Sequence, residues 1–297
     1  MSTTHATRTG EVRDTRPDVR NAMADLAALE RATRSAPTFR PEQKVGGASV
    51  MALRALVLVV LVGGWELAAR ADVIDPFFYS MPSQIWSTGV DAFTEGTIVS
   101  DTVFTFTSTI AGFVLGTIGG VTLGLSFWWS KRYALVAEPF VVAFEAMPKL
   151  ALAPIVVLIL GIGMSSKIAM ACALVIVIQA LNAYAGVKSV DSDLTRMIQS
   201  LGATRWQIFT KVVVPTALPW IVSGLRVTIG LALAGAIVGE YIGSTQGIGR
   251  LIQYAGTTYE ISLIWVGIFV LAALSMVLYM LVGLIERRWL ASLHASR

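Results

Sequence analysis

The sequence contains very few of the residues on which most catalytic and metal sites depend. It has one cysteine, Cys172, so no disulfide can form within the chain. Its two histidines, His5 and His294, lie near the ends, and no closely spaced cysteine and histidine set is present to bind zinc. These absences exclude a central histidine catalyst and a zinc site of the usual kind.

Nucleotide-binding patterns are also absent. The chain has no Gly-x-x-x-x-Gly-Lys-[Ser/Thr] phosphate loop, so we do not expect it to bind ATP by that route. Gly161-Ile162-Gly163 lies between two apolar runs with no strand before it, so it is not a dinucleotide fingerprint. The net charge of +4 does not indicate nucleic-acid binding, because the basic residues lie in the N-terminal segment and beside apolar runs. We predict no enzyme activity, no cofactor, no metal and no nucleic-acid partner.

Apolar residues dominate most of the chain. They make up 55% of it, and charged residues only 14%. A soluble domain usually has about a quarter of its residues charged, and a helix needs roughly 20 apolar residues to cross a bilayer. The composition therefore predicts an all-α polytopic membrane protein. About six transmembrane helices are expected, at residues 49–68, 103–129, 134–160, 167–187, 217–243 and 262–286.

Residues 1–48 have a different composition. They are polar, rich in Arg, Thr and Ala, and lack an apolar period, which predicts a disordered cytoplasmic tail. Within the tail, Asn21 to Arg34 could form a short helix, and contact with anionic lipid is an alternative to a solvated tail. A signal peptide cleaved at Ala69-Arg70-Ala71 is a competing interpretation, but the polar segment before the apolar run is too long for a normal n-region.

The charges of the connecting segments predict the orientation in the membrane. Residues 69–102 carry one basic residue, Arg70, among several acidic ones. Most other Lys and Arg lie in the tail, at Lys131-Arg132, in residues 188–211 and at Arg287-Arg288. Because short cytoplasmic loops carry an excess of Lys and Arg, we expect all these segments and both termini to be cytoplasmic. Lys188, Arg205 and Lys211 are interpreted as topology determinants rather than as contacts.

Glycines repeat at helical spacing in two of the predicted spans. The repeats are Gly112, Gly116, Gly120 and Gly124 in one, and Gly235, Gly239 and Gly243 in the other. Small residues on one face let helix backbones approach closely inside a membrane. The pattern predicts tight helix packing, either within the chain or at a subunit interface or moving contact.

Few ionisable residues fall inside the predicted spans, where they should face protein or water. Glu145 and Lys149 are spaced i, i+4 and are expected to pair, either as a structural element or as part of a solute pathway. Arg226 has no evident partner in the sequence. If the solute is an anion, Lys149 and Arg226 are candidates to stabilise it. Glu240 is expected at the outer mouth or at the membrane interface.

The segment 200–219 is polar and lies between two long apolar runs. Gly202 follows a short helical pattern, and Thr204 with Gln207 forms a capping box that predicts a second helix. Pro215 and Pro219 are expected to break or kink that helix. The preceding helix, about Asp193 to Leu201, would place Leu194, Ile198 and Leu201 on one face, either to anchor a partner or to pack on the chain itself.

This segment resembles the coupling loop of binding-protein-dependent ABC importer permeases. Gly202 holds that family's glycine position, and Val212-Val213-Val214-Pro215 holds its Ile-x-Leu-Pro position at the family spacing. Arg196-Met197-Ile198 departs from the family's Glu-Ala-Ala, which puts one salt bridge to the ATPase in doubt. The Leu-Gly-Ala-x-Arg-Trp-Gln run from Leu201, with Met147–Pro154 and Leu160–Gly163, resembles the nitrate, sulfonate and taurine branch. The resemblance covers roughly residues 76–290.

The resemblance implies a permease subunit over residues 49–297, with a coupling loop at about 188–216. The implied partners are two copies of an ATPase subunit, an extracytoplasmic substrate-binding protein, a second copy of this chain and membrane lipid. The solute would be a small anion such as a sulfonate, taurine or nitrate, or alternatively a pyrimidine precursor of thiamine. A stand-alone secondary transporter is the alternative from another class. The residues implied in ATPase coupling are Leu194, Arg196, Ile198, Leu201, Gly202, Ala203 and Pro215.

Overall fold

The computed structural model describes residues 47–295, together with residues 26, 28, 29 and 31. This part of the chain is helical and contains no strand, which confirms the all-α prediction. The tail predicted over residues 1–48 lies almost entirely outside the described residues. The chain divides into two compact units, residues 1–58 and residues 59–297.

Five helices among the described residues are long and apolar enough to cross a membrane. They correspond to five of the six predicted spans. Their cores are α2 (Gly47–Arg70), α5 (Thr97–Ser126), α8 (Met164–Lys188), α11 (Val214–Ile242) and α13 (Ile261–Ala295). The short 3₁₀ turn η1 (Phe127–Trp129) extends α5.

The sixth predicted span, residues 134–160, is not one helix. Helix α6 (Lys131–Ala146) ends at Met147, and the 3₁₀ turn η2 (Lys149–Leu152) leads into α7 (Ala153–Leu160). The two halves are bent by 78°. Pro148 accounts for the break, because a proline disfavours the helical conformation of the residue before it, and Met147 is extended with ψ at 137°. The two helices are apolar enough to form one span together, so the sixth predicted span is present as a bent pair rather than a single helix.

Pro215 and Pro219 were expected to break or kink their helix, and they do not break it. The chain stays helical from Arg205 to Ile242 through α10 (Arg205–Ile208), the π-helical turn η3 (Phe209–Val213) and α11. A proline removes an intrahelical hydrogen bond and crowds the preceding turn. The wide π turn lies directly before Pro215, which occupies the first turn of α11, so it provides the space that the ring needs.

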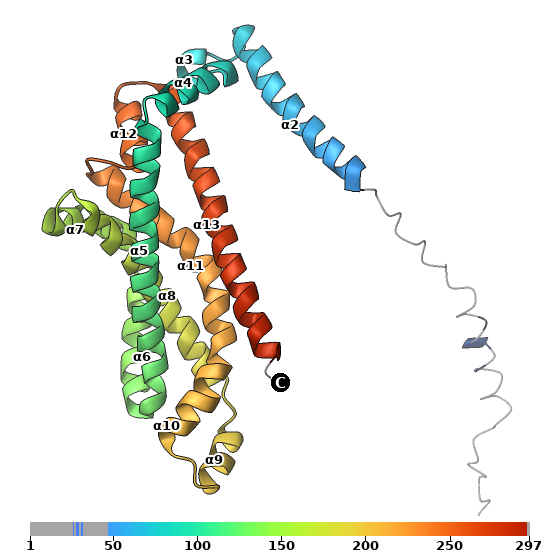
Figure 1. Cartoon of the computed structure of the whole chain (residues 1–297), viewed down its shortest axis with the longest axis vertical. Helices are drawn as coiled ribbons and strands as arrows, with labels where there is room; N and C mark the ends of the chain where they lie inside the picture. The colour runs from blue at the N-terminus through green and yellow to red at the C-terminus, as the bar shows by residue number, and fades with distance from the viewer. Residues whose placement is uncertain (1–25, 27, 30, 32–46, 296–297) are drawn as a thin grey trace, which may run out of the picture. The chain divides into compact units, whose positions relative to one another are not determined.

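Helix α8 lies at the centre of the second unit, between α5 and α11, which both pack against it (Figure 1). A Cβ added at Gly116 of α5 would lie 2.7 Å from Cβ of Val175, and one at Gly235 of α11 would lie 2.8 Å from the carbonyl oxygen of Met170. Both distances are below normal contact. Gly112, Gly120, Gly124 and Gly239 also meet residues of α8, so these glycines face α8 within the same chain. Gly243 instead meets Val157 of α7 and Ile162.

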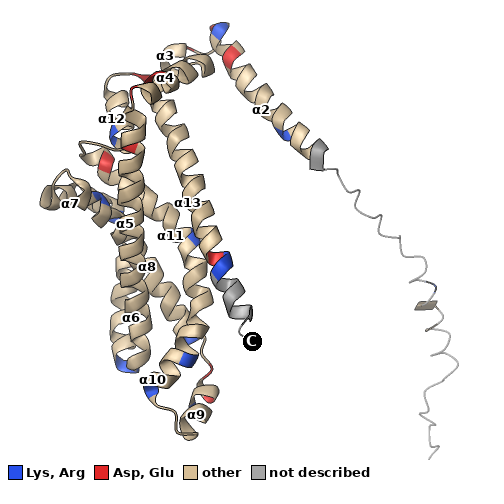
Figure 2. Cartoon of the chain, viewed as in Figure 1, with Lys and Arg blue, Asp and Glu red and all other residues tan. Residues whose placement is uncertain are grey.

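Short helices lie at both ends of the second unit (Figure 1). Helices α3 (Pro76–Tyr79), α4 (Pro82–Thr94) and α12 (Ile248–Thr257) lie toward one end, as does α7. The sequence analysis did not predict α3, α4 or α12. Helices α9 (Ser192–Ser200) and α10 lie at the other end. Figure 2 shows that the long helices carry little charge along their lengths and that basic residues mark the ends of α6 and α10.

Candidate functional site

Helix α9 is a short helix at the end of the second unit, with its first turn fixed by a side chain. Asp191 accepts hydrogen bonds from the backbone N–H groups of Asp193 and Leu194 through Oδ1, at 2.7 and 3.4 Å. Such an N-cap satisfies donors that a helix start leaves unpaired. The helix lies close to the predicted range of Asp193 to Leu201, with its start one residue earlier.

The apolar residues of α9 and its C-terminal cap are not covered by the chain. No residue of α9 is buried. Leu194, Met197 and Leu201 are 41%, 58% and 78% exposed, while Ile198 is half-buried. The packing of this face on the chain's own body, one of the two alternatives, is thus at most partial. Met197, three residues after Leu194, extends the face and was missed, because the sequence analysis followed only the series Leu194, Ile198 and Leu201. Such an apolar face on an otherwise polar helix is typical of an interaction site.

The residues after α9 form a defined elbow. Gly202 donates its N–H to the carbonyl oxygen of Gln199 at 3.0 Å, and Ala203 donates to that of Ile198 at 3.3 Å. Gly202 has φ at +90°, which side-chain-bearing residues rarely adopt. These two bonds and the positive φ are those of a Schellman motif. The capping box predicted at Thr204 and Gln207 is confirmed. Thr204 is the N-cap of α10, which begins at Arg205.

Arg205 joins this elbow to the end of α5. Its Nη2 donates to the carbonyl oxygen of Trp129 at 3.0 Å, and its guanidinium lies over the Trp128 ring at 5.5 Å. Trp206 stacks on Trp129 with ring centroids 5.9 Å apart, and Phe209 contacts both rings. We call Trp128, Trp129, Arg205, Trp206 and Phe209 the aromatic clamp. Arg205 therefore makes contacts within the chain that the sequence analysis did not predict.

Lys188 also makes a contact that the sequence did not predict. Its Nζ pairs with Glu138 of α6 at 2.7 Å and lies 4.3 Å from the centre of the Tyr184 ring. The Tyr184 hydroxyl donates to the same carboxylate at 3.2 Å. Lys188 therefore ties the end of α8 to α6, directly before the segment that leads into α9.

The two cations proposed along a pathway each have a carboxylate partner. The expected pair of Glu145 and Lys149 is present at 2.9 Å, and Lys149 is only 8% exposed. Its Nζ also donates to the carbonyl oxygen of Glu145. Arg226 pairs with Glu286 of α13 and lies 5.3 Å from the centre of the Tyr279 ring. Each cation is thus paired within the chain.

A buried polar cluster holds α12 at the opposite end of the unit. The backbone N–H groups of Gly247, Ile248 and Gly249 donate to side chains of Asp101, Thr105 and Glu240, at 2.7, 3.0 and 2.8 Å respectively. These acceptors belong to α5 and α11, so the first turn of α12 is capped by other helices. Glu240 is 1% exposed, so neither predicted location, an outer mouth or a membrane interface, is correct.

Lys167 completes this cluster from α8. It is fully buried, and its Nζ donates to the carbonyl oxygens of Ile162 and Gly243. Asp101, expected in an outer loop, is also buried and pairs with Arg250 at 3.2 Å. These residues were missed because their partners lie up to 149 positions away in the sequence. The cluster fixes the loop between α11 and α12.

Comparison with known proteins places this chain in one family. Residues 112–291 match the family described as binding-protein-dependent transport system inner membrane component. The chain is 31% identical over 219 residues to the formylaminopyrimidine transport permease protein ThiX of Halalkalibacterium halodurans, covering 74% of this chain and 87% of that protein. It is 30% identical over 236 residues to the taurine transport system permease protein TauC of Escherichia coli, covering 78% and 86%.

Two further similarities extend these findings. The chain is 30% identical over 240 residues to the riboflavin transport system permease protein RibX of Chloroflexus aurantiacus, covering 80% of this chain and 90% of that protein. Among solved structures, an inward-facing MetNI methionine ABC transporter aligns with a TM-score of 0.52 at 22% identity, covering 65% of this chain and 94% of that one. At that identity the structural match shows the fold alone.

The helical membrane fold and the family match define a permease subunit of an ABC importer. The chain belongs to the family of binding-protein-dependent inner membrane permeases. It is a multi-pass inner membrane protein and not itself an enzyme, since a separate subunit hydrolyses ATP in this family. The alternative of a stand-alone secondary transporter is thereby overturned.

Proposed function

We propose that two copies of this chain form a pathway through the membrane and that each copy uses α9 to bind an ATPase subunit. The single observation that carries the proposal is the exposed apolar face of α9, made by Leu194, Met197 and Leu201. A partner that covers this face removes apolar side chains from water, which is the main driving force for association. Ile198 lies at the inner edge of the same face.

The elbow and the aromatic clamp support a role in transmitting movement. Because α9 has no buried residue, a force on it passes to the membrane helices mainly through Gly202, Ala203 and α10. The Schellman motif and Arg205 make this connection stiff. Closure of two ATPase subunits on ATP would thus move the ends of α5 and α11 and open the pathway on the opposite side to a substrate-binding protein.

The proposed orientation places α9, α10 and both termini in the cytoplasm. The basic residues at this end, including Lys131, Arg132 and Arg205, favour the cytoplasmic side of a membrane. The opposite end, with α4 and α12, would then face the substrate-binding protein. Arg196 is 81% exposed and pairs weakly with Asp193 at 3.8 Å, so it is free to contact the ATPase in place of the family's usual glutamate.

For the solute we propose a small sulfonate, with taurine as the first candidate. The support is the similarity to the taurine permease TauC and to the putative aliphatic sulfonates transport permease protein SsuC of Bacillus subtilis, at 27% identity. The formylaminopyrimidine relative supports the second candidate, a pyrimidine precursor of thiamine. Lys149 and Arg226 are paired with carboxylates, so an anion would meet neutral ion pairs rather than free cations.

Growth on single nutrient sources tests this function. A strain lacking the gene would be supplied with taurine, alkanesulfonates or nitrate as the single sulfur or nitrogen source, or with a thiamine precursor. We expect growth on taurine to be lost and to be restored by the wild-type gene but not by Gly202→Val. Loss on the thiamine precursor alone would favour the second solute, and unchanged growth on every source would contradict both.

A further inference from the structure

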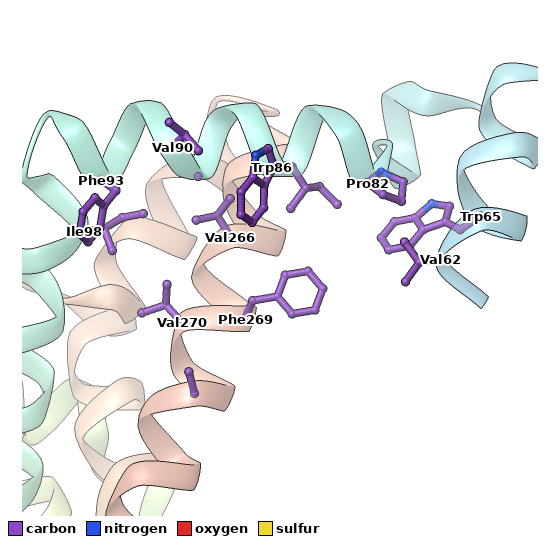
Figure 3. A pocket seen from close by; sticks show the side chains of 13 residues that line it. Val62, Trp65, Pro82, Trp86, Val90, Phe93, Ile98, Val266, Phe269 and Val270 are labelled. Carbon is purple, nitrogen blue, oxygen red and sulfur yellow. The ribbon is translucent and has the colours of Figure 1, made fainter. Parts of the chain in front are cut away.

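An apolar cavity of about 630 Å³ lies between the last turns of α2, the helix α4 and the first half of α13. Figure 3 shows Trp86 of α4, Phe269 of α13 and Val62 of α2 around one open space. No residue that lines it carries a charged side chain, and all of them belong to the second unit. The lining also includes Trp65, Phe93, Val266, Val270 and Ala273.

The cavity has fixed walls. Glu66 of α2 accepts hydrogen bonds from the backbone N–H and the hydroxyl of Ser83 in α4, at 3.1 and 2.9 Å. The rings of Trp65 and Trp265 lie 5.1 Å apart and join α2 to α13. Since three helices are linked at these points, the space between them is part of the fold.

The position of the cavity indicates what fills it. Both α2 and α13 are long and apolar enough to cross a membrane, so we expect the open side of the cavity to face the bilayer. Trp86 and Phe269 are 77% and 52% exposed there, and indole rings concentrate at the level of lipid headgroups. A polar solute would leave its hydrogen-bonding groups unpaired against these walls, which is costly. The walls therefore fit a hydrocarbon chain.

A cation lies close in sequence to the cavity wall, since Glu66 bonds Ser83, the residue after the lining residue Pro82. Arg70, one turn beyond Glu66, donates through Nε to that carboxylate at 2.7 Å, and its side chain is 64% exposed. Within the part of the chain that the structure describes, its two terminal nitrogens have no partner. A guanidinium with free terminal nitrogens binds phosphate in a bidentate manner. An apolar recess with such a cation at its polar edge matches a phosphate-bearing amphiphile.

We propose that the cavity binds one phospholipid of the bilayer, with an acyl chain between Trp86 and Phe269 and the phosphate on Arg70. The lipid fills the space between α13 and residues 59–70 of α2, all within the second unit, and completes the packing of those residues. This site is separate from α9, so it does not depend on the proposed ATPase contact or on the identity of the solute.

Native mass spectrometry of the full-length chain tests the proposal. The protein would be purified in detergent, stripped of lipid and titrated with phosphatidylglycerol. We expect one tightly retained phospholipid per chain. Ala273→Trp places an indole in the cavity and should abolish this retention. Ala272→Trp adds the same side chain at the exposed neighbouring position, outside the lining, and should leave retention unchanged.

Further variants separate the phosphate contact from the acyl-chain contact. Arg70→Gln should weaken phosphatidylglycerol binding several-fold and leave binding of diacylglycerol, which lacks phosphate, unchanged. If Ala273→Trp does not give a folded protein, Gly89→Leu fills the cavity from α4, where an added Cβ meets only Val266 at 3.5 Å. Equal retention in the cavity and control variants would overturn the proposal. A retained mass equal to that of a second chain would also overturn it. So would equal binding of phosphatidylglycerol and diacylglycerol by the wild-type protein.

Discussion

The Nη2 of Arg205 donates to the carbonyl oxygen of Trp129 at 3.0 Å, which joins the start of α10 to the end of α5. The two residues are 76 positions apart in the sequence. The bond lies next to the elbow at Gly202, so it connects the exposed helix α9 to a helix of the membrane core. A role for the elbow in coupling makes this bond part of the mechanism.

Replacement of Arg205 should separate ATP hydrolysis from transport. Arg205→Ala removes the hydrogen bond and the contact with Trp128, but not the exposed face of α9. We expect the ATPase to remain bound and active while transport per ATP hydrolysed falls several-fold. Arg205→Lys is the matched control, since it keeps the charge and only part of the hydrogen-bonding geometry. Its transport per ATP hydrolysed should lie between those of the wild type and Arg205→Ala. The measurement is solute uptake and phosphate release in the same proteoliposomes.

An equal loss of hydrolysis and uptake in Arg205→Ala would contradict this interpretation, because it would indicate a general loss of fold. The thermal midpoint of each variant serves as the check. Arg205 is exposed, and surface substitutions usually change stability by no more than about 0.5 kcal/mol. The variant should therefore melt near the wild-type temperature.

Substitutions at Gly202 should act through backbone conformation alone. A Cβ at this position meets nothing within 4 Å, yet φ is +90°. A left-handed conformation costs an ordinary residue roughly 1–2 kcal/mol, and Asn tolerates it better than others. We therefore expect Gly202→Val to impair transport strongly and Gly202→Asn to impair it less. Uptake rates of the two variants, normalised to protein in the membrane, provide the measurement; a greater defect in the Asn variant would argue against the elbow geometry.

A methyl group on the α5 stripe should destabilise the membrane core. Gly116→Ala places Cβ 2.7 Å from Cβ of Val175 and 3.0 Å from the carbonyl oxygen of Cys172. Overpacking of this kind costs typically about 1–3 kcal/mol. Gly230→Ala in α11 is the control, because nothing lies within 4 Å of its added Cβ. Thermal unfolding in detergent should show a lower midpoint for the first variant only, and equal midpoints would refute close packing of α5 on α8.

Thr105 should control the opening of the first turn of α12. Thr105→Val leaves the Ile248 N–H without its acceptor and removes a donor to Glu240. An unpaired buried group costs about 1–3 kcal/mol. Amide exchange at residues 247–249 should therefore become faster. Thr107→Val, an exposed threonine that bonds only the carbonyl oxygen of Val103, should leave this exchange unchanged. Unchanged exchange in both variants would contradict the capping role.

Local sequence patterns predicted the parts of the structure that depend on local interactions. The spans around Gly116 and Gly235 follow from hydropathy, and the elbow at Gly202 follows from capping chemistry. The bend at Pro148 and the π turn before Pro215 were not predicted, because a proline can either break a helix or be accommodated by a wider turn. Packing decides which of these occurs.

The polar sites could not be predicted because their partners are distant in the sequence. Glu240 gains its donors from Thr105 and Gly249 only when α5, α11 and α12 meet. Arg226 likewise finds Glu286 on α13, 60 positions later. The hydropathy of each span places these residues in a helix but carries no information about the neighbouring helix. The aromatic clamp was missed for the same reason.

Binding of the cognate ATPase subunit to variants of α9 tests the proposed coupling most directly. Leu194→Asp and Met197→Asp place a charge on the apolar face, while Gln199→Asp adds the same charge on the opposite face of the helix as the control. Substitution of a hot-spot residue at the centre of an interface costs about 2 kcal/mol or more, about thirtyfold in affinity. We predict loss of ATPase co-purification in the first two variants and retention in the third. Retention of the ATPase by all three, with unchanged affinity, would contradict the assignment of α9 as the coupling helix.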